Sequence, residues 1–105
     1  MSDLPVVVIG AGPTGLAAAT HLRSRGIDAV VLEAGPEAAA AVREWSHVRL
    51  FSPWRELVDP TAVALLDATG WQSPAIDAFP TGGEWAEAYL QPLADALGNV
   101  RYGSR

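Results

Sequence analysis

The sequence predicts an α/β fold with a parallel sheet, because its first third has the pattern of strand, helix and strand. Residues 5–9 (PVVVI) form a β-branched run without polar alternation, which is typical of a strand covered on both faces. Pro13 suits the first turn of a helix that runs to Gly26, and residues 28–33 (DAVVLE) predict a second buried strand that ends on an acid. Strand, helix and strand within about 30 residues make a right-handed βαβ unit.

The middle of the chain predicts shorter elements. A short helix is expected within residues 34–45, starting near their proline, and a brief extended segment is expected over residues 47–51. The pair Asp59 and Pro60 favours the start of a helix that a glycine closes at position 70. Residues 71–80 contain two prolines and predict a loop.

A last helix is predicted after Thr81, which can form a capping box with Glu84. Its apolar residues recur every four positions and share one face: Trp85, Tyr89, Leu93 and Leu97. Pro92 is expected to kink this helix or to mark a restart, and Gly98 to end it. Residues 99–105 then begin a third strand.

The composition indicates a small globular domain and excludes several chemistries. Of the 105 residues, 50% are hydrophobic and 18% charged, so a packed core is expected. Seven basic and twelve acidic residues give a net charge of −5, the wrong sign for binding nucleic acid or anionic lipid. Without cysteine there is no disulfide, thiolate metal site or redox thiol. We therefore expect no metal and no nucleic-acid partner, and a cytoplasmic location.

A membrane span is the alternative explanation for the N-terminal apolar run. Residues 4–22 contain no Asp, Glu, Lys or Arg and approach the roughly 20 residues that cross a bilayer. Three glycines and a proline at their centre would break hydrogen bonds that lipid cannot replace. Asp3 also stands where a secretory signal carries basic residues. We expect neither a membrane span nor a signal peptide.

The sequence GAGPTG lies between the first strand and the helix, with its glycines at 10, 12 and 15. Gly10 permits a tight turn, Gly12 lets a pyrophosphate approach the backbone, and Gly15 lets the helix pack closely on the strand. The helix N-terminus offers free N–H groups and the positive end of its dipole to a diphosphate. The other motif residues would line this cradle through their backbone: Ala11, Pro13 and Thr14.

Glu33 ends the second strand, 18 residues after Gly15, where a carboxylate can accept both hydroxyls of an adenosine ribose. It would repel the phosphate of a 2′-phosphorylated nucleotide. A glycine-rich turn without a ligand is the structural alternative. Because strand, glycines, helix, second strand and acid occur in register, we favour a Rossmann-type dinucleotide site.

Two or three parallel strands form an incomplete doubly wound domain, which normally has at least five or six. Residues 1–105 are therefore expected to be the N-terminal portion of a nucleotide-binding domain in a larger protein.

Residues 6–33 (VVVIGAGPTGLAAATHLRSRGIDAVVLE) resemble the N-terminal FAD-binding segment of two-dinucleotide-domain flavoproteins, which include flavin-containing monooxygenase-like and pyridine nucleotide-disulfide oxidoreductase-like enzymes. This resemblance implies FAD as the cofactor. Residues 79–97 (FPTGGEWAEAYLQPLADAL) resemble a loop and helix of the monooxygenase-like members. Residues 50–57 (LFSPWREL) correspond to a loop near the flavin in that family.

The sequence departs from the family in one place. The family usually carries a pair of glycines after the strand-ending acid, and this sequence has Ala40 and Ala41 at those positions. Either this loop runs differently or the flavin contacts come from residues 52–55. The cofactor contacts that the resemblance adds to the motif are Ala34, Ser52, Trp54 and Arg55. Two of them have structural alternatives, because Trp54 can belong to the core and Arg55 can form a surface salt bridge.

The resemblance implies that the parent protein is an FAD-dependent oxidoreductase, monooxygenase-like, acting on a small-molecule substrate. Its flavin would accept hydride from NAD(P)H bound at a second site outside this sequence. The catalytic residues and the substrate pocket are expected downstream, so the chain alone should not turn over. An NAD-linked dehydrogenase and a non-catalytic nucleotide-binding fragment are the alternative functions.

Overall fold

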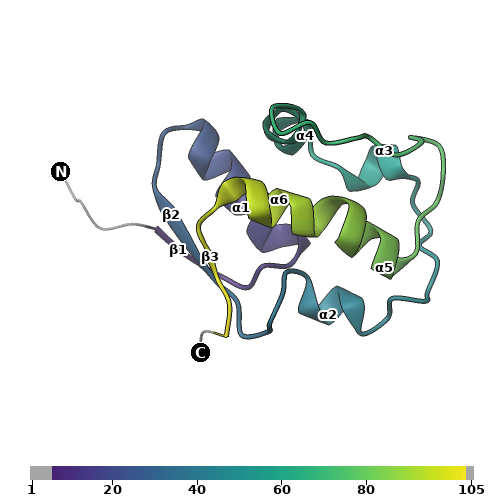
Figure 1. The fold of residues 1–105 in the computed structure, drawn as a ribbon, viewed down its shortest axis with the longest axis horizontal. Coiled ribbons are helices and arrows are strands. Elements are labelled where there is room, and N and C mark those ends of the chain that lie inside the picture. The colour runs from purple at the N-terminus through teal and green to yellow at the C-terminus, as the bar shows by residue number, and fades with distance from the viewer. Residues whose placement is uncertain (1–5, 104–105) are drawn as a thin grey trace.

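The computed structural model describes residues 6–103, which form a three-stranded parallel sheet with helices packed beside it (Figure 1). The strands β1 (Val6–Ile9), β2 (Ala29–Leu32) and β3 (Val100–Arg101) lie in the spatial order β1-β2-β3. Helix α1 (Pro13–Ser24) connects β1 to its parallel neighbour β2. The predicted α/β fold with an N-terminal βαβ unit is therefore confirmed, as is the start of a third strand.

Strand β1 is only half covered. Its Val7 is 53% exposed and its Ile9 78%, whereas Val31, on the helix-covered face of the neighbouring strand, is fully buried. Residues 5–9 were expected to be covered on both faces. This expectation is wrong for residues 6–9, which are the part of the strand that the structure describes. The physical reason is that the helices within residues 6–103 bury one face of the sheet and leave the other open.

Helix α1 begins at Pro13 and buries Leu16, Ala19 and Thr20. The Thr20 hydroxyl donates to the Leu16 carbonyl at 2.7 Å, which satisfies this buried polar group inside the helix. Gly26 follows the helix with a φ of 72°, a left-handed conformation that closes helices readily.

Two short helices lie in the connection that follows β2, α2 (Ala40–Arg43) and α3 (Trp54–Leu57). The first begins later than the proline within residues 34–45 had suggested, because Ala39 takes a left-handed conformation and interrupts the helix there. The expected extended segment at residues 47–51 forms a single antiparallel bridge, between Arg49 and Thr81.

The last helical rod consists of three segments, α5 (Gly82–Trp85), the π-helical η1 (Ala86–Leu90) and α6 (Gln91–Leu97). Its capping box is present, since the Thr81 hydroxyl accepts from the Glu84 N–H and the Glu84 carboxylate accepts from the Thr81 N–H.

Pro92 was expected to kink this helix or to mark a restart. The α-helical segment α6 begins at Gln91, directly after the π-helical η1, with Pro92 in its first turn, so the restart is confirmed. The Gln91 N–H donates five residues back, to Ala86, as in a π-helix. Pro92 has no N–H for the Ala88 carbonyl, four residues earlier, and the Trp71 indole N–H donates to that carbonyl instead, at 2.7 Å. A tertiary hydrogen bond thus replaces the backbone bond that proline removes.

The core lies between α1, the α5–η1–α6 rod and helix α4 (Pro60–Asp67). Its largest fully buried aliphatic side chains come from all three of these and from β2: Leu16, Val31, Leu66, Leu90 and Leu93. No helix in residues 6–103 combines the length and apolarity needed to cross a membrane.

Asp59 joins three of the packed helices. Its Oδ1 caps α4 by accepting from the Thr61 N–H at 2.7 Å, and its Oδ2 lies 2.6 Å from Nε2 of His21 on α1. Its own N–H donates to the Tyr89 hydroxyl on η1. Partial burial raises the pKa of the Asp59 carboxyl, but the hydrogen bonds from His21 and Thr61 lower it more, so its pKa lies below the ordinary value.

The lowered pKa of Asp59 predicts a loss of stability in acid. Its contribution is complete above the ordinary carboxyl value of 3.8 and declines as the pH falls through the lower pKa of the folded state. Chemical denaturation between pH 6 and pH 2.5 should show a shallower acid loss for Asp59→Asn, which keeps a capping side chain without the charge. Identical pH dependence in the two proteins would contradict this assignment.

Candidate functional site

A cleft of about 430 Å³ opens at the carboxyl ends of β1 and β2, where α1 begins. Three parts of the chain line it, namely the glycine turn, the Glu33 side chain and residues 39–42. In parallel α/β sheets, ligands bind outside the carboxyl ends of the strands. The cleft therefore brings together the motif, the strand-ending acid and the loop in which the family departure lies.

The three glycines of the turn face different surroundings. Gly10 has a φ of 91°, and a Cβ built on Gly15 would lie 2.0 Å from the Gly10 carbonyl oxygen, so the fold itself requires both. A Cβ on Gly12 would meet no atom within 4 Å. Gly12 is thus not required by packing, and the space beside its backbone is open to a ligand.

The N-terminus of α1 is an uncompensated positive helix end. The helix has no side-chain cap and no acidic residue in its first turn. Within residues 6–103, the backbone N–H groups of Gly12, Thr14 and Gly15 donate to no acceptor. These donors and the helix dipole suit an anion at the floor of the cleft.

Glu33 is 9% exposed and has both carboxylate oxygens engaged by backbone N–H groups. Its Oε1 accepts from Ala11 and its Oε2 from Gly35, each at 2.8 Å. The side chain therefore ties the glycine turn to the end of β2, a structural role that the sequence alone did not indicate. Each carboxylate oxygen has a second lone pair, so two further donors can still be accepted.

The loop that forms the other wall of the cleft turns at Ala39. This residue has φ 59° and ψ 37°, and within residues 6–103 it is the one non-glycine residue with a positive φ. It is buried, and its N–H donates to the Ala11 carbonyl at 2.8 Å. The sequence comparison had located the departure at Ala40 and Ala41, but the conformation that favours glycine lies one residue earlier.

Five predicted contacts lie outside the lining of this cleft, and the first of them, Ala11, is fully buried. Ala34 is exposed beside Glu33, and Ser52 is partly buried in the loop before α3. Trp54 is 6% exposed and belongs to the hydrophobic core. Arg55 pairs with Asp77 at 2.6 Å and with Glu56 at 3.9 Å, as its structural alternative had proposed.

Among the described residues, no three His, Asp or Glu side chains are grouped in a way that could hold a metal ion.

Alanine substitution should separate the glycine required by the fold from the glycine that faces the cleft. Gly15→Ala forces helix and turn apart and should lower the free energy of unfolding by about 3 kcal/mol. Gly12→Ala meets open space and should change it by less than about 1 kcal/mol, the size of an N-cap preference. Urea denaturation of both variants measures this contrast, and equal losses would contradict it.

Glycine at position 39 should stabilise the protein. Ala39→Gly relieves the left-handed conformation and should raise the free energy of unfolding by up to about 1 kcal/mol. Ala40→Gly, one residue later and inside α2, is the matched control and should lower it by about 0.5 to 1 kcal/mol. Thermal denaturation distinguishes the two, and a loss for both substitutions would disprove the strain at Ala39.

Comparison with known proteins relates this geometry to flavoenzymes. The profile of the family described as pyridine nucleotide-disulphide oxidoreductase matches residues 7–98. Bacilliredoxin reductase Bdr of Bacillus subtilis (strain 168) is 41% identical over 51 residues, which are 49% of this chain and 16% of the relative.

Solved structures share the fold. A mutant flavin monooxygenase from Stenotrophomonas maltophilia is 32% identical with a TM-score of 0.71, over 96% of this chain and 28% of that one. OTEMO in complex with FAD and NADP is 22% identical with a TM-score of 0.69, over 100% of this chain and 20% of that one. Bacillithiol disulfide reductase Bdr from Staphylococcus aureus is 20% identical with a TM-score of 0.70, over 98% of this chain and 29% of that one. At the identities of the last two, the likeness is one of fold.

The chain spans between 16% and 29% of the lengths of these relatives. The family profile, by contrast, covers most of the chain, from β1 to the end of α6, and includes every residue that lines the cleft. This chain belongs to the pyridine nucleotide-disulphide oxidoreductase family.

Proposed function

We propose that the cleft binds the ADP half of FAD and that residues 1–105 are the N-terminal portion of the FAD-binding domain of an FAD-dependent oxidoreductase. The observation that carries this proposal is the meeting, in one cleft, of a helix end with free N–H donors, open space at Gly12 and the Glu33 carboxylate. The first two features suit the diphosphate, and the third suits the adenosine ribose.

The diphosphate would lie against the start of α1. Free N–H groups at Gly12, Thr14 and Gly15 can donate to phosphate oxygens, and the helix dipole favours their negative charge. Gly10, Ala11 and Pro13 would shape the turn from which these donors project. Because Gly12 has no side chain, phosphate can approach its backbone directly.

The adenosine ribose would lie at Glu33. The ribose hydroxyls can donate to the lone pairs that the Ala11 and Gly35 N–H groups leave free. A phosphate on the 2′ oxygen would bring negative charge against this carboxylate, so the site should reject 2′-phosphorylated nucleotides. Ala34, next along the chain, would border the adenosine.

The identity of the relatives supports FAD over NAD at this site. They include a flavin monooxygenase at 32% identity, and OTEMO was solved with both FAD and NADP. We place the flavin half of FAD beyond the cleft, toward residues 50–55, with Ser52, Trp54 and Arg55 as the contacts to be tested. Bound flavin supplies the redox chemistry by accepting hydride, here from NAD(P)H at a separate site.

We favour a monooxygenase-like oxidoreductase acting on a small molecule, because the 32% identity to the flavin monooxygenase extends over 96% of this chain. A disulfide reductase is the second candidate, supported by the 41% identity to bacilliredoxin reductase over 51 residues. The alternatives are an NAD-linked dehydrogenase, which the following experiment separates from both, and a non-catalytic nucleotide-binding fragment.

Titration of the full chain with FAD, NAD⁺, ADP and adenosine 2′,5′-bisphosphate tests the proposed site. FAD and ADP should raise the thermal midpoint, since ligand at a hundred times its Kd adds about 2.7 kcal/mol to stability. The 2′-phosphorylated nucleotide should have little effect. Gly12→Ala should weaken FAD binding more than about tenfold because its Cβ fills the phosphate space.

Ala18→Ser, on the exposed side of α1, is the matched control and should bind FAD as the wild type does. A chain that binds NAD⁺ and not FAD would support the dehydrogenase, and a chain that binds neither would contradict the nucleotide site.

A further inference from the structure

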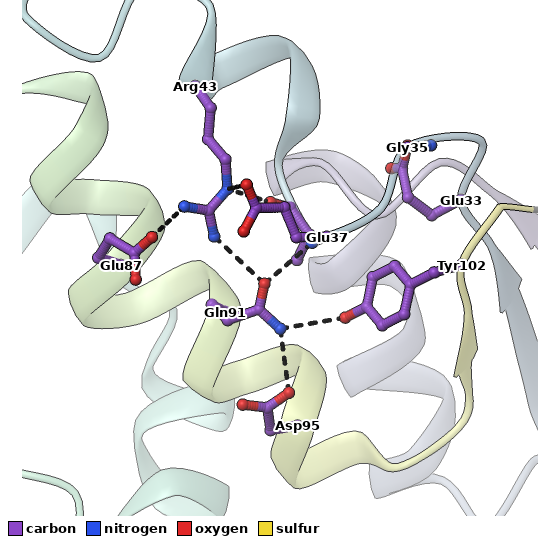
Figure 2. Close-up of polar contacts among 9 residues, drawn as sticks. Glu33, Gly35, Glu37, Arg43, Glu87, Gln91, Asp95 and Tyr102 are labelled. Carbon is purple, nitrogen blue, oxygen red and sulfur yellow. Dashed lines mark hydrogen bonds and ion pairs between the residues drawn. The ribbon is translucent and has the colours of Figure 1, made fainter.

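The wall of the cleft at Ala39 is held by two side chains, that of Arg43 in the following helix and that of Gln91 on the helical rod far along the sequence. Both polar atoms of the neighbouring Ala38 backbone are bound by them. The Ala38 N–H donates to Oε1 of Gln91 at 3.0 Å, and the Ala38 carbonyl accepts from Nε of Arg43 at 2.8 Å. Figure 2 shows Gln91 on the long helical rod, facing Arg43 and the loop that contains Glu37.

Gln91 and Arg43 also bind each other, so the two anchors act together. Nη2 of Arg43 donates to Gln91 Oε1 at 3.2 Å, the same oxygen that accepts from Ala38. The Arg43 side chain is 15% exposed, and its charge is balanced by Glu37, at 3.5 Å, and by an ion pair with Glu87. A largely buried, paired guanidinium is held in one place by several partners.

The other end of the Gln91 amide is fixed as well. Its Nε2 donates to Asp95 at 3.0 Å and to the Tyr102 hydroxyl at 3.1 Å (Figure 2). The next residue, Gly103, donates its N–H to the Gly35 carbonyl, beside Glu33. Gln91 therefore connects the loop before α2, the long helical rod and the chain that follows β3.

We infer that Gln91 and Arg43 are positioning residues of the dinucleotide cleft. They hold the turn at residues 38–39, which forms one wall of the cleft, in its left-handed conformation. An alanine in a left-handed conformation relaxes unless its surroundings fix it. Here the Ala39 N–H binds the Ala11 carbonyl inside the glycine motif, so movement of the turn would disturb the phosphate cradle directly. This inference rests on the proposed function.

Hydrogen exchange in the full chain without ligand tests whether Gln91 and Arg43 hold the turn at residues 38–39. Gln91→Leu removes both the oxygen and the nitrogen of the side-chain amide and keeps a side chain of similar volume. The Ala39 amide should then exchange about tenfold faster. Arg43→Lys keeps the charge but loses the bond to Ala38, and should act in the same direction. Asp95→Ala, one turn along α6, should leave Ala39 unchanged, and the Val31 amide of the core sheet should be unaffected throughout.

FAD affinity of the folded protein then tests positioning. Gln91→Leu should bind FAD about five- to tenfold more weakly, and adding Ala39→Gly should restore most of that loss, because glycine adopts the left-handed turn without help. A purely structural role would lower the thermal midpoint and leave the affinity of the folded fraction unchanged.

If the exchange rate of the Ala39 amide is unchanged in both Gln91→Leu and Arg43→Lys, these side chains do not hold the turn and the inference is wrong. Faster exchange with wild-type FAD affinity overturns their role in positioning the cleft. A wild-type chain that binds no FAD overturns the proposed function instead, while the exchange comparison still decides whether these side chains hold the turn.

Discussion

Helix α1 meets the glycine turn so closely that position 15 has no room for a Cβ. The rest of the site depends on this contact. It brings the helix N-terminus to the end of β1, where the residues that carry the unpaired N–H groups line the cleft. A Cβ at Gly12, by contrast, would meet no atom within 4 Å, so one short motif contains a glycine that the fold requires and another that only a ligand would require.

The glycine turn is held from two further sides. Glu33 binds the Ala11 N–H from the end of β2, and Ala39 binds the Ala11 carbonyl from the loop before α2. Both polar atoms of the Ala11 backbone are therefore occupied by the protein, while those donors that face the cleft stay free. Preorganisation of this kind lowers the cost of binding, because the donors need not be ordered when the ligand arrives.

Local signals in the sequence were enough to predict much of this arrangement. Pro13, the glycines and the β-branched runs each act over a few residues, and the βαβ unit that they predict is present. The capping box at Thr81 was recognisable for the same reason. The exposure of Ile9 was not predictable. An apolar strand pattern indicates that both faces can be buried, but it does not indicate which segments pack on each face.

The features that the sequence did not indicate depend on contacts between distant residues. Gln91 binds Ala38 from 53 positions away, and Trp71 supplies the hydrogen bond that Pro92 cannot, 17 positions from its acceptor. The left-handed turn at Ala39 has no local signal either, since alanine disfavours it and only the surrounding bonds fix it. Trp54 and Arg55 could be assigned to core and surface only once their neighbours were known.

Binding of the dinucleotide at the glycine turn is measured most directly by the amide NMR spectrum of the ¹⁵N-labelled chain during titration with FAD. We expect the signals of Gly12, Thr14 and Gly15 to shift together and to saturate at one Kd. ADP should shift the same signals, and the amide signals of α4 should stay in place. Shifts confined to another surface, or no shift at the glycine turn when FAD is saturating, would contradict this expectation.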